Sequence, residues 1–373
     1  MSGSIRYHEG KFPPHELDWV QLVPLIGPVN AAVARYDGML SAIPNAHVLL
    51  SPLFTQEAVL SSRIEGTQAT MGEVLEYEAK GSVEEPSSPK EADIWEVLNY
   101  RKAMHHATKQ LKQLPLCQRI IFECHKILLS SVRGSGKSPG QYRKIPNWIG
   151  PKGCSIEDAR FVPISAEKLP EAMSNWEKYM HSSSPDRLVQ LAIIHAEFEA
   201  LHPFLDGNGR LGRMLIPLYL HQVGLIAQPM FYISAYLESH RDEYYDRLLT
   251  VSRDNDWSGW CVFFLNVIRI QAEENLGKTQ AILDLYNRMK PGFAELTHSQ
   301  YAIHALDWIF EQPIFKSSDF VRSASIPKPT AKRILNLLKT EGILREIQPG
   351  SGRQAAIIAY PELLNIAEGY DAF

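Results

Sequence analysis

Long hydrophobic runs are missing from this sequence of 373 residues. A membrane-spanning helix needs about 20 consecutive apolar residues, whereas runs here, such as LAII at residues 191–194, are far shorter. The first residues, MSGSIRYHEGKF, also lack the apolar core of a secretory signal. The sequence therefore predicts no membrane partner.

Cysteine is scarce as well, and no two cysteines form a CxxC pair. The four are Cys117, Cys124, Cys154 and Cys261. Cysteines scattered in this way are typical of reduced, packed side chains in a cytoplasmic protein. There is also no excess of charge of one sign, because the formal net charge is only -4. A chain of this charge has no general attraction to nucleic acid.

The patterns that are present predict a mostly α-helical protein. Strand-like alternation of apolar and polar residues is scarce, no internal repeat is found, and helical periodicity is common. We expect a helical region over residues 1–90, a helical core over 91–290 and a small domain of a different kind over 297–373. The polar, proline-bearing stretch at 81–91 predicts a loop or linker.

Two shorter segments stand out within this plan. Residues 51–66 predict a helix, with Ser51 as its cap, Pro52 at its first position and Gly66 at its end. Residues 140–170 are rich in glycine, proline and β-formers, so they predict a short β-hairpin between helices.

One string, HPFLDGNGRLGR at residues 202–213, carries most of the functional information. Gly207 and Gly209 flank Asn208, so this turn can point backbone N–H groups at an anion. A helix follows, and free N–H groups at a helix N-terminus favour negative charge. Arg210 and Arg213 lie three residues apart on one face of that helix. Two guanidiniums beside a glycine turn indicate a polyphosphate site.

The same string supplies an acid and a base. Asp206 can hold a Mg²⁺ ion that in turn binds phosphate. His202 precedes the turn and can accept a proton from an incoming hydroxyl. The alternative is a plain connecting turn with solvated arginines, which does not require this selection of side chains. The combination favours phosphoryl or nucleotidyl transfer.

The string resembles the signature of the Fic family, His-x-Phe-x-(Asp/Glu)-Gly-Asn-Gly-Arg-x-x-Arg, and meets it at every fixed position. The resemblance implies a helical core with a short hairpin flap, and transfer of AMP from ATP to a protein hydroxyl. It implies His202 as general base and Asp206 as Mg²⁺ ligand. It places the α- and β-phosphates at Asn208, Gly209 and Arg210, and the γ-phosphate at Arg213.

The resemblance extends to other segments. The hairpin candidate at Arg160, Phe161 and Val162 resembles the flap that aligns a target segment by strand pairing, although a plain surface hairpin would have the same pattern. In RDEYYDRL, Tyr244 and Tyr245 resemble a tyrosine pair that helps to enclose the nucleoside. Neighbouring tyrosines on a helix point in different directions, so we expect at least one of them to be a packing residue.

SSRIEG, residues 61–66, fits the family's inhibitory pattern (Ser/Thr)-x-x-x-Glu-(Gly/Asn). The resemblance therefore implies the class whose inhibitory helix precedes the core. Glu65 at the end of a helix is expected to pair with Arg213, which removes the guanidinium needed for the γ-phosphate. Ser61, one turn earlier, is expected to bind near the same place, and Gly66 completes the pattern. The alternative is an exposed carboxylate without a partner.

The last domain resembles a winged helix, with a helix-turn-helix pattern followed by two strands about a glycine-rich turn. Residues 316–360 hold eight Lys or Arg against three Asp or Glu. This basic surplus predicts phosphate contacts by Lys328, Lys332, Arg333 and Arg353 to DNA. The alternatives are that the domain binds protein or closes a homodimer.

Together these features predict a cytoplasmic protein adenylyltransferase that uses ATP and Mg²⁺, modifies a hydroxyl of a target protein or of itself, and is inhibited by Glu65. One alternative is a DNA-binding regulator whose core only senses a nucleotide. Another is removal of AMP, or transfer of a different phosphate-linked group, by the same core.

Overall fold

The computed structural model describes all residues except 1–3, 44, 82–84, 131, 133, 135, 152 and 352–353. The described chain is mostly helical, as the sequence predicts. Its helices are α1 (Trp19–Ala42), α2 (Ala46–Leu49), α3 (Ser51–Ile64), α4 (Met71–Lys80), α5 (Pro89–Gln110), α6 (Gln118–Leu128), α7 (Leu169–His181), α8 (Arg187–Leu201), α9 (Asn208–Gln222), α10 (Ser234–Ser239), α11 (Arg241–Asp254), α12 (Trp257–Thr297), α13 (Ala302–Glu311), α14 (Ser317–Ser323), α15 (Lys328–Thr340) and α16 (Pro361–Glu368). The strands are β1 (Ile5–Arg6), β2 (Phe161–Val162), β3 (Ile314–Lys316), β4 (Arg345–Gln348) and β5 (Ile357–Ala359).

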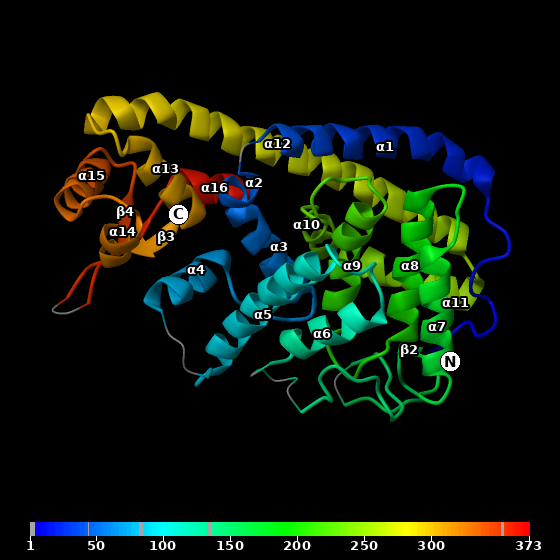
Figure 1. Cartoon of the computed structure of the whole chain (residues 1–373). Helices are drawn as coiled ribbons and strands as arrows, with labels where there is room; N and C mark the ends of the chain where they lie inside the picture. Colours follow the sequence, from blue (N-terminus) through cyan, green and yellow to red (C-terminus); the bar gives the residue numbers. More distant parts are fainter. Residues whose placement is uncertain are drawn as a thin grey trace.

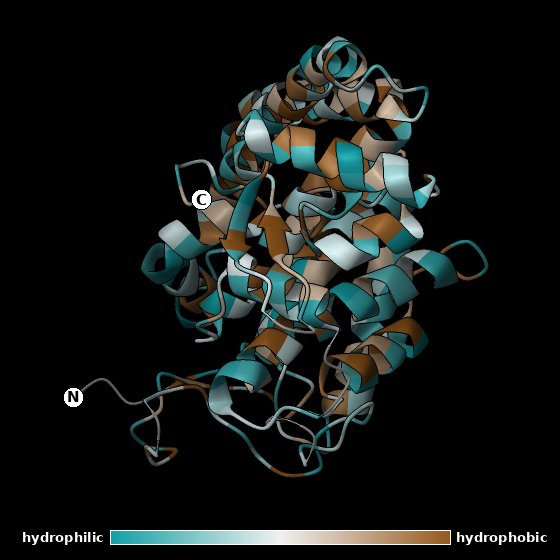
Figure 2. Ribbon diagram, turned by 90° about the vertical axis from the view of Figure 1, so that its left-hand side faces the viewer, coloured by the Kyte–Doolittle hydropathy of each residue, from teal (hydrophilic) through white to brown (hydrophobic). Residues whose placement is uncertain are grey.

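The longest helix, α12, runs the length of the molecule and connects its two ends (Figure 1). Helix α1 lies alongside it, while α13–α16 gather at one end of it and α7, α8 and α11 lie near the other (Figure 1). Among the described residues, no helix combines the length and the apolarity that crossing a membrane requires. Hydrophobic and hydrophilic residues alternate along the helices (Figure 2), so each helix has an apolar side to bury.

Helices α8 and α9 form the centre of the core. Asp186 begins α8, because its side chain accepts hydrogen bonds from the N–H groups of Leu188 and Val189 at 2.9 Å each. Almost every residue of α8 is buried, and most of α9 is buried too. The short connection between them is the string HPFLDG, so the turn is fixed between two helices that the core holds in place.

Helix α3 begins one residue earlier than expected, because Ser51 is its first residue and not its cap. Leu50 occupies the cap position without a side-chain hydrogen bond, and Pro52 follows in the first turn. The helix ends at Ile64 with Glu65 as the C-cap, and Gly66 leaves it with a φ of 99°. That left-handed backbone suits glycine, which has no Cβ to clash. Helix α3 packs against α5, α10 and α16, so it is central rather than peripheral.

The segment from 140 to 170 differs from the expected hairpin in its pairing. Its one strand, β2, has a parallel partner in β1 at the beginning of the chain, with Ile5 opposite Phe161. The antiparallel arm of the hairpin is reduced to a single bridge between Ile149 and Phe161. The proline-rich sequence YRKIPNWIGPKG explains this, because proline lacks the N–H that a longer ladder needs.

The C-terminal elements α13–α16 surround a three-stranded antiparallel sheet in the order β3-β5-β4. The observed order is helix, strand, two helices, two strands and a last helix. The sequence predicts the three helices and the two strands β4 and β5, but it does not predict β3 or α16. Lys328, Lys332 and Arg333 lie exposed on α15, whereas Arg353 lies outside the described residues. These elements do not stand apart from the rest, because α16 packs against α3 and β3 packs against α4.

Candidate active site

The turn between α8 and α9 is shaped by two left-handed residues and one asparagine. His202 ends α8 with a φ of 47°, and Gly207 precedes α9 with a φ of 80°. The side chain of Asn208 binds both backbone groups of Phe204, accepting from its N–H and donating to its carbonyl at 2.9 Å each. Asn208 therefore fixes the turn with its side chain. Its backbone begins α9, and free N–H groups at a helix N-terminus can bind an anion.

Arg143 holds the backbone at His202 and so fixes the position of this residue. The Arg143 side chain donates from Nε to the His202 carbonyl at 2.9 Å, and the Arg143 N–H donates to the carbonyl of Pro203 at 3.0 Å. Burial lowers the pKa of His202 to about 4, so the ring is neutral at pH 7 and has a nitrogen lone pair to accept a proton. Arg143 was not singled out from the sequence, because it lies 59 residues before the histidine.

His125 is a second residue that the sequence did not reveal. Its Nδ1 accepts from the N–H of Gly140 at 2.8 Å, so Nε2 carries the proton and donates to the Asp206 carbonyl at 3.1 Å. Its ring stacks on Phe204 with 3.8 Å between centroids. Burial lowers the pKa of His125 to about 4, which keeps this neutral tautomer at pH 7. His125 thus fixes the backbone that presents the Asp206 carboxylate.

Asp206 and Arg210 lie side by side at the mouth of the turn. The Arg210 guanidinium contacts the Asp206 carboxylate at 3.4 Å and Glu96 at 3.3 Å, and it is itself buried. The Asp206 side chain remains 42% exposed and thus accessible to a ligand. No group of three or more acidic, histidine or cysteine side chains among the described residues could hold a metal ion. A Mg²⁺ ion at Asp206 would need phosphate oxygens and water for its other ligands, as Mg²⁺ sites at nucleotides usually do.

Arg213 is fully buried, and the end of α3 holds it. Its Nε donates to the Ser61 hydroxyl at 2.9 Å, and its Nη2 donates to the Ser61 carbonyl at 2.7 Å and to Glu65 Oε1 at 2.6 Å. Burial alone would raise the pKa of Glu65, but the Arg213 guanidinium holds it below its ordinary value. The structure therefore brings Ser61, Glu65 and Arg213 together, whereas Gly66 contributes only the turn after the helix.

A cavity of about 500 Å³ lies beside His202 and Glu65, whereas Asp206, Arg210 and Arg213 are not among the residues that line it. Glu65, His202 and Gly209 line one part of it, and Arg160 and Phe161 of the flap segment line another. The rest of the lining comes from Ile149, Gly150, Pro151, Ala196, Glu199, Ala200, Arg241, Asp242, Tyr245, Leu248 and Leu249. Val162 is buried instead, and its carbonyl accepts from the N–H of Tyr7 at 2.9 Å.

The two tyrosines of α11 have different surroundings. Tyr245 lines the cavity, with the Arg241 guanidinium 5.4 Å from the centre of its ring. Tyr244 is fully buried, and its hydroxyl binds His195 Nε2 at 2.8 Å. Of the two candidates for the nucleoside, only Tyr245 faces the cavity, and Tyr244 is the packing residue.

Comparison with known proteins identifies the family of this chain. The Fic/DOC family N-terminal model matches residues 23–109 and the Fic/DOC family model matches residues 115–220, so together they cover more than half of the chain. The chain belongs to the Fic family. The matched regions contain Ser61, Glu65 and the whole string from His202 to Arg213.

Relatives of known name match over shorter stretches. A probable protein adenylyltransferase of Aquifex aeolicus is 34% identical over 88 residues, which is 21% of this chain and 28% of the relative. The protein adenylyltransferase Fic of Drosophila virilis is 29% identical over 133 residues, or 35% of this chain and 25% of the relative. The chain thus spans only about a quarter of the length of these relatives.

Solved structures confirm the fold. A Fic family protein from Desulfovibrio desulfuricans superposes with a TM-score of 0.60 at 19% identity, covering 93% of this chain and 98% of that one. A Fic domain-containing signalling protein from Bacteroides thetaiotaomicron has a TM-score of 0.55 at 18% identity, covering 69% of this chain and 97% of that one. At these identities the likeness concerns the fold.

Proposed function

We propose that this Fic protein is a protein adenylyltransferase that transfers AMP from ATP to a hydroxyl group of a protein. The observation that carries the proposal is the junction of α8 and α9, where a neutral histidine and a helix N-terminus face one cavity. In the reaction, the acceptor oxygen attacks the α-phosphorus while His202 takes its proton. The bond from the α-phosphorus to the bridging oxygen breaks, and pyrophosphate leaves.

The residues of the turn suit ATP and Mg²⁺. The N-terminus of α9 and the Arg210 guanidinium would hold the α- and β-phosphates, and Arg213 would hold the γ-phosphate. Asp206 would hold Mg²⁺ through its exposed carboxylate. When bound there, Mg²⁺ neutralises phosphate charge and stabilises the leaving pyrophosphate.

Autoinhibition belongs to the same proposal. Arg213 has an anionic partner at 2.6 Å in Glu65, and the Glu65 side chain lines the cavity while Arg213 lies buried behind it. A carboxylate in that position competes with the γ-phosphate for the guanidinium, so ATP would bind in a pose that is unsuited to attack. Release of Glu65 would then permit transfer.

The rim of the cavity supports a protein acceptor. Ile145, Trp148 and Ile149 are 57%, 42% and 38% exposed on the segment that faces the flap strand. Exposed large apolar side chains beside a polar site are typical of protein contact surfaces. The backbone of Phe161 and Val162 already pairs with Ile149 and β1. We therefore propose that the target docks on residues 145–149 rather than by pairing with residues 160–162.

The test is incubation of the pure protein with α-labelled ATP and Mg²⁺, with and without cell extract. Label on a protein band that survives denaturation supports AMP transfer, and γ-labelled ATP should leave no label. Binding of ATP without label on any protein, in wild type and Glu65→Gly alike, would favour a nucleotide sensor. Loss of AMP from a premodified protein would favour the reverse reaction.

A second function is proposed for the C-terminal elements, as a winged-helix domain that contacts DNA. Its support is the exposed basic face of α15, formed by Lys328, Lys332 and Arg333. Contact with a protein or a second copy of the chain remains the alternative. We also propose a cytoplasmic location, which the four unpaired cysteines support because disulfides are rare there.

A further inference from the structure

Glu199 is a partly buried acid in the wall of the active-site cavity, and the proposed mechanism leaves it without a role. Its Oε1 has no hydrogen-bond partner in the described part of the chain and lies against Gly212 of α9. A buried polar group without a partner is costly, and at a binding site it usually indicates a ligand. Burial raises the pKa of Glu199 to about 8, so at pH 7 the neutral acid both donates and accepts hydrogen bonds.

Its place along the cavity indicates which part of the nucleotide it meets. Glu199 lies in the last turn of α8, three residues before His202, and both side chains line the cavity. His202 and Gly209 line the cavity and suit phosphates, and the apolar side chains of Leu248 and Phe161, which suit a base, line it as well. Glu199 thus lines the same cavity as both sets of groups.

Helices α8 and α11 pack against each other, and both contribute residues to the cavity. The ring of His8 contacts Glu197 at 2.9 Å and Ser252 at 2.7 Å, so residue 197 of α8 lies close to residue 252 of α11. Glu199 of α8 faces the same cavity as Tyr245 and Leu248 of α11. In ATP, the ribose is the group between the phosphates and the base.

We propose that Glu199 binds a ribose hydroxyl of ATP and makes the site selective for ribonucleotides over deoxynucleotides. This inference rests on the proposed function, because it takes ATP as the nucleotide. A site that hydrogen-bonds a hydroxyl rejects an analogue that lacks it, since its own polar group is then left unpaired. Glu199 acts here by direct contact with the substrate.

The test measures binding of ATP, 2′-deoxy-ATP and 3′-deoxy-ATP by titration calorimetry, in a Glu65→Gly background so that the γ-phosphate position is free. Adding Glu199→Ala should weaken the binding of ATP by about threefold to tenfold, which corresponds to the loss of one hydrogen bond. It should leave unchanged the affinity for the analogue that lacks the contacted hydroxyl. Glu199→Gln is the matched control, because the amide also donates and accepts, and it should keep most of the selectivity.

The proposal would be overturned if Glu199→Ala weakened the binding of all three nucleotides equally, or if it weakened the binding of none. If Glu199→Gln lost affinity as strongly as Glu199→Ala, a negative charge beside Arg213 would be the role of this acid, and the ribose contact would be wrong. Thermal melting of each variant excludes misfolding. Calorimetry needs no AMP transfer, so a failure of the proposed reaction stays distinct from a failure of this contact.

An independent observation concerns the helix that carries Glu65, because α3 is held from two sides. On the core side, the buried Glu57 accepts from the N–H and the hydroxyl of Ser234 at 2.9 and 2.6 Å. On the other side, α16 of the C-terminal unit packs directly on α3. The inhibitory helix therefore lies between the core and the proposed winged-helix domain.

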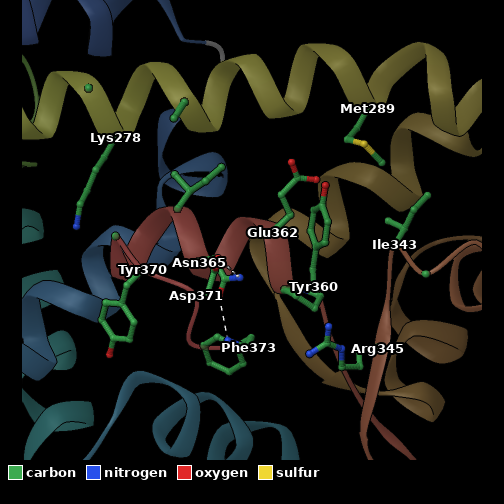
Figure 3. Close-up of a pocket in the computed structure, with 16 residues that line it drawn as sticks. Lys278, Met289, Ile343, Arg345, Tyr360, Glu362, Asn365, Tyr370, Asp371 and Phe373 are labelled. Atoms are coloured by element: carbon green, nitrogen blue, oxygen red, sulfur yellow. Dashed lines mark hydrogen bonds between the residues drawn. The ribbon is translucent and has the colours of Figure 1, made fainter.

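The contact with α16 is polar and specific. Gln56 of α3 donates to the carbonyl of Glu368 at 3.2 Å and to its carboxylate at 3.1 Å. Lys278 of α12 donates to the Gln56 side chain at 3.1 Å and to the Ala367 carbonyl at 2.8 Å. Figure 3 shows Lys278 reaching from α12 toward the C-terminal segment beside a cavity of about 740 Å³.

The end of the chain adds an apolar contact. A Cβ on Gly72 of α4 would meet the Phe373 ring at 3.0 Å, so the ring lies on the helix that follows α3. Asn365 holds this end in place, because its side-chain oxygen accepts from the N–H groups of Ala372 and Phe373 at 3.0 Å each (Figure 3). Lys316 of β3 also donates to the Lys80 carbonyl at the end of α4, at 2.7 Å.

We infer that docking of the C-terminal unit on α3 and α4 keeps Glu65 on Arg213, so that movement of this unit regulates AMP transfer. This inference rests on the autoinhibition in the proposed function. Gln56 and Glu65 belong to one continuous stretch of α3 and its cap, so a displacement at one end is carried rigidly to the other. A ligand of the C-terminal unit that moves α16 would thereby activate the enzyme.

The test uses the full chain with Gln56→Ala and, separately, Phe373→Ala, which removes only a half-buried ring at the terminus. Both should raise hydrogen exchange in residues 51–66 and raise AMP transfer toward the level of Glu65→Gly. In a Glu65→Gly background, neither substitution should raise the rate of AMP transfer any further. The control is Arg288→Ala, which removes an exposed ion pair with Glu362 of α16 and touches no residue of α3.

Wild-type exchange and transfer in both variants would overturn the inference. Raised exchange with wild-type transfer, in an assay where Glu65→Gly is active, would also overturn it, because docking would then not control the enzyme. If Glu65→Gly showed no transfer, the proposed function would be wrong, whereas the exchange data would still decide whether α16 holds α3.

Discussion

At the scale of single residues, the site depends on burial more than on any unusual side chain. His202 is neutral because the core surrounds it, and Arg143 and His125 fix the backbone on either side of the turn. Arg213 is buried and keeps its charge in partnership with Glu65. Each of these groups is common in proteins, and their chemistry comes from being held together away from water.

His202→Ala should abolish AMP transfer and leave ATP affinity within about threefold, because the imidazole accepts a proton from the acceptor hydroxyl and binds no part of ATP. A lost general base typically costs 10²–10⁴ in rate. The measurement pairs a labelled-ATP transfer assay with calorimetric titration of ATP. Transfer at the wild-type rate would remove His202 from the mechanism.

At the scale of elements, two helices meet at one arginine. Helix α9 carries Arg213, and the end of α3 occupies its guanidinium through Ser61 and Glu65. The contact is tight, because a Cβ on Gly209 would meet Glu65 Oε1 at 2.1 Å. Phosphate and carboxylate therefore cannot share this place.

Glu65→Gly should raise AMP transfer by at least tenfold, because the γ-phosphate gains the guanidinium that Glu65 holds. Arg213→Ala should be nearly inactive, and combining it with Glu65→Gly should not restore activity, since the phosphate partner is then missing. Rates of label incorporation for the four proteins, measured side by side, check this. Equal rates in wild type and Glu65→Gly would contradict the inhibitory role.

A further prediction concerns DNA binding by the exposed basic face of α15. DNA affinity should fall steeply with salt, because each phosphate contact releases counterions, and Lys332→Ala with Arg333→Ala should reduce the salt slope by about two. Fluorescence anisotropy with labelled duplex DNA at several salt concentrations measures both. If no binding is seen even at low salt, the domain contacts protein instead.

At the scale of the whole molecule, buried neutral histidines connect stability with pH. Burial lowers the pKa of His125 and His202 to about 4 and that of His195 to about 3. The ordinary value in an unfolded chain is about 6.5. The unfolded state therefore binds more protons than the folded state between these values. The stability that these groups contribute is fully present above pH 6.5 and is lost as the pH falls toward 4.

The free energy of unfolding should therefore decrease as the pH is lowered from 6.5 to 4.5. Each such histidine contributes up to about 1.4 kcal/mol per pH unit. His195→Gln should lower stability at pH 7 and make the slope shallower by up to that amount, because one proton fewer is taken up on unfolding. Urea denaturation at a series of pH values measures the slope. A slope identical to that of wild type would show that His195 is already protonated in the fold.

The sequence by itself determined the parts of this protein whose physics is local. The glycines at 207 and 209, the neighbouring arginines and the histidine lie within twelve residues, so the turn and the helix that follows it could be predicted from spacing alone. The helical character and the pattern Ser61-x-x-x-Glu65 are local in the same way. The pairing of Glu65 with Arg213 was predictable only because the family resemblance named both partners.

Tertiary structure alone decided the contacts between distant segments. The flap strand pairs with β1 rather than within a hairpin, Tyr244 packs on His195 while Tyr245 faces the cavity, and Arg143 and His125 support the turn. Gln56 meets Glu368 across more than 300 residues. No local pattern encodes such contacts, because they depend on how whole helices pack around α8 and α12. For that reason the acid at residue 199 and the docking of α16 became visible only in the fold.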